Sequence, residues 1–190
     1  MAKILIVYGT TEGQTRKICQ HISAYLSANG SSSDVVDSAN IVETLHLGRY
    51  DGFILAGSLH EGRHQAPLIR FAKDHATELH GRPSAFLSVS LTAVISDEKH
   101  TREARACMDR FYEDTGWTPT ASTPVAGALL YTEYNFFKRL LLQMISKHEG
   151  GDTDTSRDYE YTDWAKLDRF VSDFVGQYVE PRMGVSGLVS

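Results

Sequence analysis

Residues Ile4 to Ile22 read ILIVYGTTEGQTRKICQHI, an apolar run that ends in a turn rich in hydroxyls and glycine and opens directly into a helix. The run Ile4 to Val7 is typical of a strand buried on both faces of a parallel sheet. Thr10 to Thr15 then offer hydroxyls and closely spaced backbone N–H groups at a helix start, where unpaired amides and the helix dipole favour an anion. The stretch therefore predicts a strand, a phosphate-binding turn and a helix.

This turn differs from two better-known phosphate loops. It has no lysine after its glycine, as the nucleoside-triphosphate loop requires, and it lacks the G-x-G-x-x-G spacing of dinucleotide folds. Hydroxyls and amides without a lysine suit a terminal phosphomonoester held without a metal. The pattern Thr10-Thr11-Glu12-Gly13-Gln14-Thr15 resembles the FMN phosphate loop of flavodoxins, so FMN is the expected cofactor.

Glu12 departs from the flavodoxin pattern, which commonly has threonine at this position. A carboxylate beside a phosphate dianion is unfavourable, so we expect the Glu12 side chain to face solvent while its backbone belongs to the loop. The competing interpretation of the whole turn is an ordinary helix start, with Thr11 as N-cap and no ligand.

Length and composition indicate one globular domain. The chain has 190 residues, of which 42% are hydrophobic, and we expect a single domain over 1–179 with a mobile tail over 180–190. A net charge of -5 argues against a general nucleic-acid binder. No apolar segment has the length of a secretion signal or a membrane span, which predicts a cytoplasmic protein. Cys19 and Cys107 are predicted to be reduced and buried, and no metal-ligand spacing is present.

Apolar strand patterns and helical patterns alternate along the chain. Expected strands are 4–7, 34–38, 52–56, 84–89 and 123–126; expected helices run to about 29–30 and over 66–79, 100–115 and 163–178. This alternation predicts an α/β, flavodoxin-like, doubly wound five-stranded parallel sheet of order 2-1-3-4-5. In such a sheet, ligands bind beyond the carboxyl ends of the strands.

Three loops follow the carboxyl ends of the first, third and fourth expected strands. The first would hold the phosphate, and the other two would flank an isoalloxazine ring. The candidate cofactor-binding residues, including two positions outside these loops, are Thr10, Thr11, Glu12, Gly13, Gln14, Thr15, Ser58, Leu59, His60, Gly62, Ser88, Val89, Ser90, Leu91, Thr92, Gly127 and Asp152.

His60, in the second loop (58–62), and His64, just after it, have two open interpretations. Each could bind a substrate carboxylate or move protons near neutral pH. Each could equally be a surface histidine in a mobile loop with neither role.

Residues 128–162 form an insertion between the fifth strand and the last helix, too long for an ordinary connection. Within it, 134–147 has an apolar helical face and carries the basic residues Lys138 and Arg139. Such a helix can lie in a membrane interface or cover a hydrophobic substrate. It can equally pack on its own domain or at a dimer contact.

A narrower resemblance rests on several motifs together: GQTR (13–16), PSAFLSVSL (83–91), VAGALLY (125–131), GGDTDT (150–155) and YTDW (161–164). In combination they are similar to the flavodoxin-like, menaquinone-dependent protoporphyrinogen IX dehydrogenase family of bacterial haem biosynthesis. The resemblance implies an FMN enzyme that oxidises protoporphyrinogen IX to protoporphyrin IX and passes electrons to menaquinone or another quinone. It also implies a position at the inner face of the cell membrane, and it leaves the oligomeric state open, a homo-oligomer included.

The resemblance implies that flavin N5 carries the chemistry. No side chain stands out as a required general base, so no catalytic residue is predicted. Cationic partners for the substrate propionates would be Arg63, His64, Lys138 and Arg139. GGDTDT lacks the glycine and glutamate positions of a calcium loop, so we interpret it as a tight turn. The alternatives are a flavodoxin-type electron carrier, for which the charge is modest, and a flavodoxin-like quinone reductase, for which we find no nicotinamide site.

Overall fold

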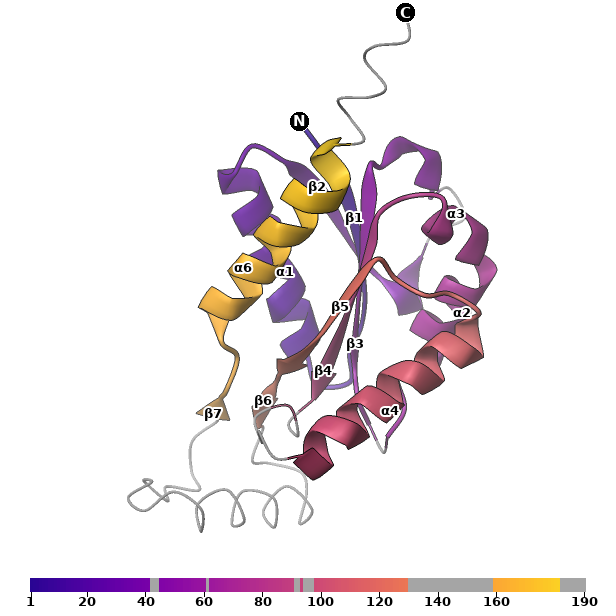
Figure 1. The fold of residues 1–190 in the computed structure, drawn as a ribbon, viewed down its shortest axis with the longest axis vertical. Coiled ribbons are helices and arrows are strands. Elements are labelled where there is room, and N and C mark those ends of the chain that lie inside the picture. The colour runs from indigo at the N-terminus through magenta and orange to yellow at the C-terminus, as the bar shows by residue number, and fades with distance from the viewer. Residues whose placement is uncertain (42–44, 61, 91–92, 94–97, 130–158, 182–190) are drawn as a thin grey trace, which may run out of the picture.

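Five parallel strands form the central sheet of the computed structural model, in the order β2-β1-β3-β4-β5 (Figure 1). They are β1 (Lys3–Gly9), β2 (Ser32–Asp37), β3 (Gly52–Ser58), β4 (Ser84–Ser90) and β5 (Ala121–Ala126). The structure describes all residues except 42–44, 61, 91–92, 94–97, 130–158 and 182–190. The predicted doubly wound topology and strand order are therefore confirmed.

Helices cover both faces of the sheet (Figure 1). On one face lie α1 (Gln14–Ala28) and α6 (Trp164–Phe174), and α6 continues as a π-helical turn, η4 (Val175–Val179). On the other lie α2 (Ala66–Asp74), α3 (Ala76–His80) and α4 (Glu98–Thr115). Two short 3₁₀ turns, η1 (Ser38–Asn40) and η2 (Leu47–Arg49), connect β2 to β3.

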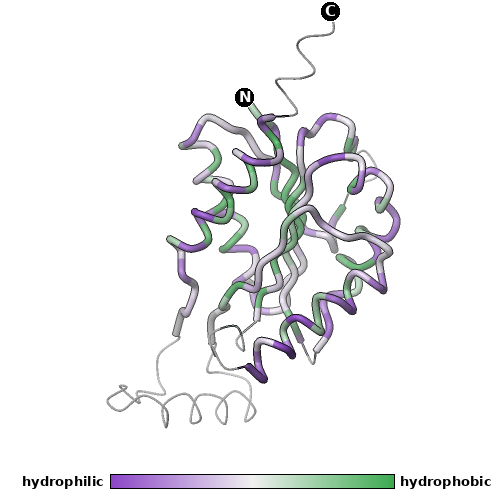
Figure 2. Tube along the Cα trace, viewed as in Figure 1, coloured by the Kyte–Doolittle hydropathy of each residue, from purple (hydrophilic) through white to green (hydrophobic). Residues whose placement is uncertain are grey.

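Alternate side chains of β1, β3 and β4 enter two separate hydrophobic cores. Ile4 and Ile6 pack toward α1 and α6, whereas Leu5 and Val7 pack toward α2 and α4. All four are fully buried, which is why this strand has no polar alternation in its sequence. Figure 2 shows the resulting apolar centre, with hydrophilic stretches on the outer helices.

The structure corrects some element boundaries. The single helix expected over 66–79 is two helices, because His75 leaves helical geometry at φ -115° and ψ 20°. The expected last helix becomes π-helical from Val175. Cys19 is buried as predicted, but Cys107 is only partly buried.

A short antiparallel ladder lies at the base of the insertion. β6 (Ala128–Leu129) pairs with β7 (Tyr159–Glu160), and Tyr161 N–H donates to the carbonyl of Gly127 at 3.1 Å. The two ends of the insertion therefore meet beside the end of β5. The amphipathic stretch 134–147 lies outside the described residues. In the part of the chain that the structure describes, none of the helices combines the length and the apolarity that a membrane crossing needs.

Candidate functional site

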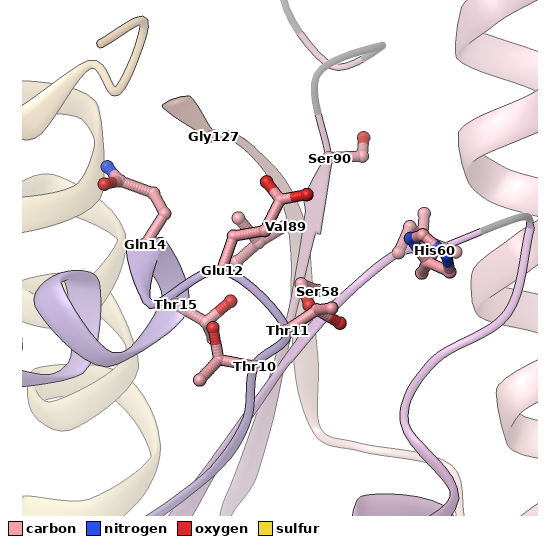
Figure 3. Close-up of a pocket in the computed structure, with 11 residues that line it drawn as sticks. Thr10, Thr11, Glu12, Gln14, Thr15, Ser58, His60, Val89, Ser90 and Gly127 are labelled. Atoms are coloured by element: carbon pink, nitrogen blue, oxygen red, sulfur yellow. The ribbon is translucent and has the colours of Figure 1, made fainter. Parts of the chain in front are cut away.

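A pocket lies at the carboxyl edge of the sheet, where the loops after β1, β3 and β4 converge (Figure 3). It encloses about 480 Å³, part of it open to solvent, which is in the usual range for small-molecule sites. Its lining is Thr10, Thr11, Glu12, Gln14, Thr15, Ser58, Leu59, His60, Val89, Ser90 and Gly127. Every one of these residues is a sequence-predicted cofactor contact.

Gly13 shapes the phosphate-type turn at the start of α1. It is the N-cap residue, with φ 88°, a conformation that other residues rarely adopt. Its N–H donates to Thr10 Oγ1 at 2.9 Å. Thr11 does not cap the helix, and α1 has no side-chain cap bond. The ordinary N-cap interpretation of Thr11 is therefore wrong.

Thr15 carries the clearest sign of a missing partner. The residue is 0% exposed, and its hydroxyl Oγ1 makes no hydrogen bond among the described residues. A buried hydroxyl without a partner costs roughly 1–3 kcal/mol. Thr15 lies in the first turn of α1, where backbone N–H groups point toward the end of the helix, so its hydroxyl and those amides form a donor cluster suited to an anion.

Glu12 is exposed, as expected, but it also lines the pocket. Figure 3 shows its side chain among those of the pocket rather than turned away from them. A negative charge thus lies beside the donor cluster, and it opposes the binding of an anion there.

The loop after β3 is held by a tight turn. His60 and Arg63 exchange two backbone hydrogen bonds of 2.9 and 3.0 Å, and Gly62 between them has φ 75°. Leu59 N–H donates to the carbonyl of Val89 at 2.8 Å, which joins this loop to the end of β4. The turn leaves the His60 and Arg63 side chains exposed beside the pocket.

His64 is neither a surface histidine nor a suitable cation. It is 6% exposed, its Nε2 shares a 3.0 Å hydrogen bond with Ser88 Oγ, and its ring meets the Phe86 and Phe111 rings edge-on. Burial lowers the pKa of His64 to about 4, so the ring is neutral at physiological pH. The expectation that His64 pairs with a propionate is not supported by this position.

Gln65 belongs to the site and was missed in the sequence. Its side-chain Nε2 donates to Thr11 Oγ1 at 3.0 Å and to Ser58 Oγ at 2.5 Å, which joins the loops after β1 and β3. A glutamine between a loop and a helix has no distinctive sequence signal, because its role depends on two partners brought near by the fold.

The insertion base is hydrogen-bonded to Gln14, a residue of the pocket lining. Gln14 Nε2 donates to Thr162 Oγ1 at 3.1 Å, and that hydroxyl donates to the carbonyl of Ala126 at 2.8 Å. Thr162 directly precedes Asp163, the N-cap of α6, which accepts a bond from the N–H of Lys166. The pocket is thereby linked to the point where the chain returns from the insertion.

Other sequence-predicted residues lie apart from the pocket or outside the described residues. Ser88 is buried with His64, while Gly13 and Gly62 act through backbone conformation. The candidates outside the described residues are Leu91, Thr92, Lys138, Arg139 and Asp152. Within the described ranges no group of three or more His, Cys, Asp or Glu side chains could hold a metal ion.

Comparison with known proteins gives the same fold and a narrower set of relatives. The family model for the flavodoxin domain matches residues 5–156. A Leishmania major protein named protoporphyrinogen IX dehydrogenase (quinone) is 39% identical over 173 residues, covering 90% of this chain and 74% of the relative. The Escherichia coli K12 protein of the same name is 34% identical over 171 residues, covering 90% and 93%.

Solved structures agree on the architecture. Oxidised flavodoxin 1 from Bacillus cereus has a TM-score of 0.54 at 16% identity, covering 93% of this chain and 99% of that one. An apo NADH:FMN oxidoreductase has a TM-score of 0.55 at 12% identity, covering 94% and 90%. At these identities the likeness concerns the fold alone.

Proposed function

The chain belongs to the flavodoxin domain family and to the narrower family of protoporphyrinogen IX dehydrogenase (quinone), and from this membership we propose its function. It binds FMN between the loops after β1, β3 and β4. It oxidises protoporphyrinogen IX to protoporphyrin IX, and a quinone, which we take to be menaquinone, accepts the electrons.

The orphaned hydroxyl of Thr15 is the observation that carries the cofactor assignment. Its Oγ1 is buried without a partner among the described residues, at a helix start that supplies further N–H donors. Thr10 and Thr11 add hydroxyls to the same pocket. A phosphate group offers several acceptor oxygens at once, and it would satisfy this donor set without a metal.

The opposite end of the pocket suits a flat heteroaromatic ring. Leu59 and Val89 offer apolar contacts, and Ser90 and Gly127, joined by a 3.1 Å backbone hydrogen bond, line the pocket beside them. A mainly apolar wall with a few polar groups is the usual composition of a site for an organic ligand. We propose that the isoalloxazine ring lies between these loops.

Bound FMN supplies a two-electron acceptor, which the protein positions and shields. The chain's own residues bind and orient the cofactor. Among the described pocket residues only Glu12 and His60 have titratable side chains, and both are exposed. Protons released from the substrate can therefore reach solvent at this edge.

Arg63 is the described candidate for contact with the substrate propionates. Its backbone is fixed by the turn with His60, and its side chain is exposed beside the pocket. A guanidinium pairs with a carboxylate through two parallel hydrogen bonds. We propose that the segment 134–147, with Lys138 and Arg139, completes the substrate or membrane contact.

An anaerobic reduction experiment tests the proposed function. The FMN-loaded protein is mixed with protoporphyrinogen IX, and then with a menaquinone analogue, while flavin absorbance and porphyrin fluorescence are recorded. The expected result is flavin bleaching, porphyrin formation and recovery of the flavin absorbance only after quinone is added.

A flavodoxin-type electron carrier gives a different result in the same assay. Its flavin stays oxidised with protoporphyrinogen IX but becomes reduced by a flavodoxin reductase. That outcome would overturn the dehydrogenase assignment while leaving FMN binding in place. Binding of the full chain to anionic liposomes tests the peripheral membrane association, and an unbound protein would contradict it.

A further inference from the structure

The side chain of Gln65, at the start of α2, forms hydrogen bonds to two neighbouring loops and not to its own helix. Gln65 is the N-cap residue, yet its side chain makes no capping bond to its own helix. Its Nε2 instead donates to the hydroxyls of Thr11 and Ser58, at 3.0 and 2.5 Å. Both hydroxyls line the pocket, and they come from different loops.

These two bonds determine where the hydroxyl protons point. A primary amide nitrogen has two N–H donors, and Gln65 uses one for each hydroxyl. Thr11 Oγ1 and Ser58 Oγ therefore act as acceptors toward Gln65. Each hydroxyl proton must point away from the amide, where it can be donated to a ligand.

Gly9 leaves the space that this arrangement needs. A Cβ at Gly9 would lie 2.9 Å from Gln65 Oε1, 3.1 Å from Gln65 Cβ and 3.2 Å from Leu68 Cβ. Oε1 itself is buried and has no hydrogen-bond partner among the described residues. An unsatisfied buried acceptor is unfavourable for stability, which is a common feature of residues that serve a site.

We propose that Gln65 is a positioning residue that fixes the Thr11 and Ser58 hydroxyls as donors toward the cofactor phosphate. Gln65 thereby sets the preference for phosphorylated flavin over unphosphorylated flavin. The inference rests on the proposed function, because it requires FMN in this pocket. It goes beyond that function by naming the residue, Gln65, that sets the selectivity for the phosphorylated cofactor through its bonds to the two hydroxyls.

The test compares FMN with riboflavin, which lacks the phosphate. Apo-protein is titrated with each flavin, and the quenching of flavin fluorescence gives both dissociation constants. Gln65→Met removes the two donors with little change in shape, and it should weaken FMN binding about tenfold. Gln65→Glu makes the group an acceptor that draws the hydroxyl protons toward itself, and it should weaken FMN binding about a hundredfold. Riboflavin affinity should change less than about twofold in either variant.

Three comparisons separate this role from a general structural one. Gln20→Met on the exposed side of α1 is the matched control, and it should leave both affinities unchanged. In a Thr11→Val, Ser58→Ala background, Gln65→Met should have no further effect on FMN, because the hydroxyls it orients are gone. Gly9→Ala should push Gln65 aside and reproduce the loss of FMN preference while Gln65 remains.

Each other outcome overturns the inference. Equal losses for FMN and riboflavin would show that Gln65 only supports the loops. Unchanged FMN affinity in both Gln65 variants, with FMN bound by the wild type, would overturn the role of Gln65 and leave the proposed function standing. A wild type that binds neither flavin would overturn both.

Discussion

Replacing Thr15 by valine should change the stability of the apo-protein and the affinity for FMN in opposite directions. The two side chains have nearly the same shape, and the position is fully buried, so packing is preserved. In the apo-protein the substitution removes a hydroxyl that lacks a partner among the described residues. The unfolding free energy should therefore rise by about 1 kcal/mol.

The FMN complex should be weakened by the same substitution. A hydrogen bond to a charged group contributes about 1.5–3 kcal/mol. The dissociation constant should therefore rise by a factor of roughly 10 to 150, because 1.4 kcal/mol is a factor of ten.

The melting temperature of the apo-protein should rise by about 2–4 °C, as expected for 1 kcal/mol in a domain of this size.

Two measurements on the same preparations decide the matter. Thermal unfolding of apo-protein gives the sign of the stability change, and fluorescence titration gives the FMN affinity. A Thr15→Ser variant, which keeps the hydroxyl, should retain most of the affinity. If Thr15→Val destabilises the apo-protein and binds FMN as tightly as wild type, the hydroxyl has a partner within the protein and the phosphate assignment of Thr15 is refuted.

Three other predictions concern the same edge of the sheet. Glu12→Gln should strengthen FMN binding several-fold at low salt and less at high salt, because a carboxylate near a dianion costs on the order of 1 kcal/mol and is screened by ions; equal affinities at all salt concentrations would contradict it. The pKa of His64 is lowered to about 4 in the folded protein, so between about pH 6.5 and pH 4 the unfolded state binds a proton that the folded state does not. The unfolding free energy should therefore fall by about 3 kcal/mol as the pH is lowered to 4. Urea denaturation at several pH values measures this fall, and the His64→Asn variant should lack it. Gly57→Ala should destabilise the protein by about 1–3 kcal/mol in urea denaturation, because its Cβ would lie 2.8 Å from Leu68 Cδ2 and 3.0 Å from His64 Cδ2; a wild-type midpoint would show that the helix shifts freely.

The fold was predictable because each strand carries its own local pattern. Ile4 to Val7 has no polar alternation, and the structure shows why, since neighbouring side chains enter cores on opposite faces of the sheet. Alternation with helices then sets a parallel topology. The break at His75 was not predictable from periodicity, because the buried Leu79 continues the apolar pattern past it.

The pocket lining was predictable for a similar reason. Residues at the carboxyl ends of neighbouring parallel strands must meet at one edge, so a list of loops is also a list of neighbours. This rule brought Thr10, Ser58 and Val89 to one pocket. It gives the place of a residue but not the direction of its side chain, and Glu12 therefore lines the pocket while remaining exposed.

Adjacent residues show what the sequence could not provide. His64 and Gln65 are neighbours in one polar stretch, yet one turns into the core beside Ser88 and the other turns to the pocket beside Thr11. Both side chains pack closely on glycines elsewhere in the sequence: a Cβ at Gly57 would lie 3.0 Å from His64 Cδ2, and a Cβ at Gly9 would lie 2.9 Å from Gln65 Oε1, so a larger residue would require a shift. Gly57 thus leaves space for the His64 side chain, and Gly9 leaves space for the Gln65 side chain. The proposed preference for a phosphorylated ligand would thus depend on a pair, Gly9 with Gln65, whose members are far apart in the sequence and meet only in the folded protein.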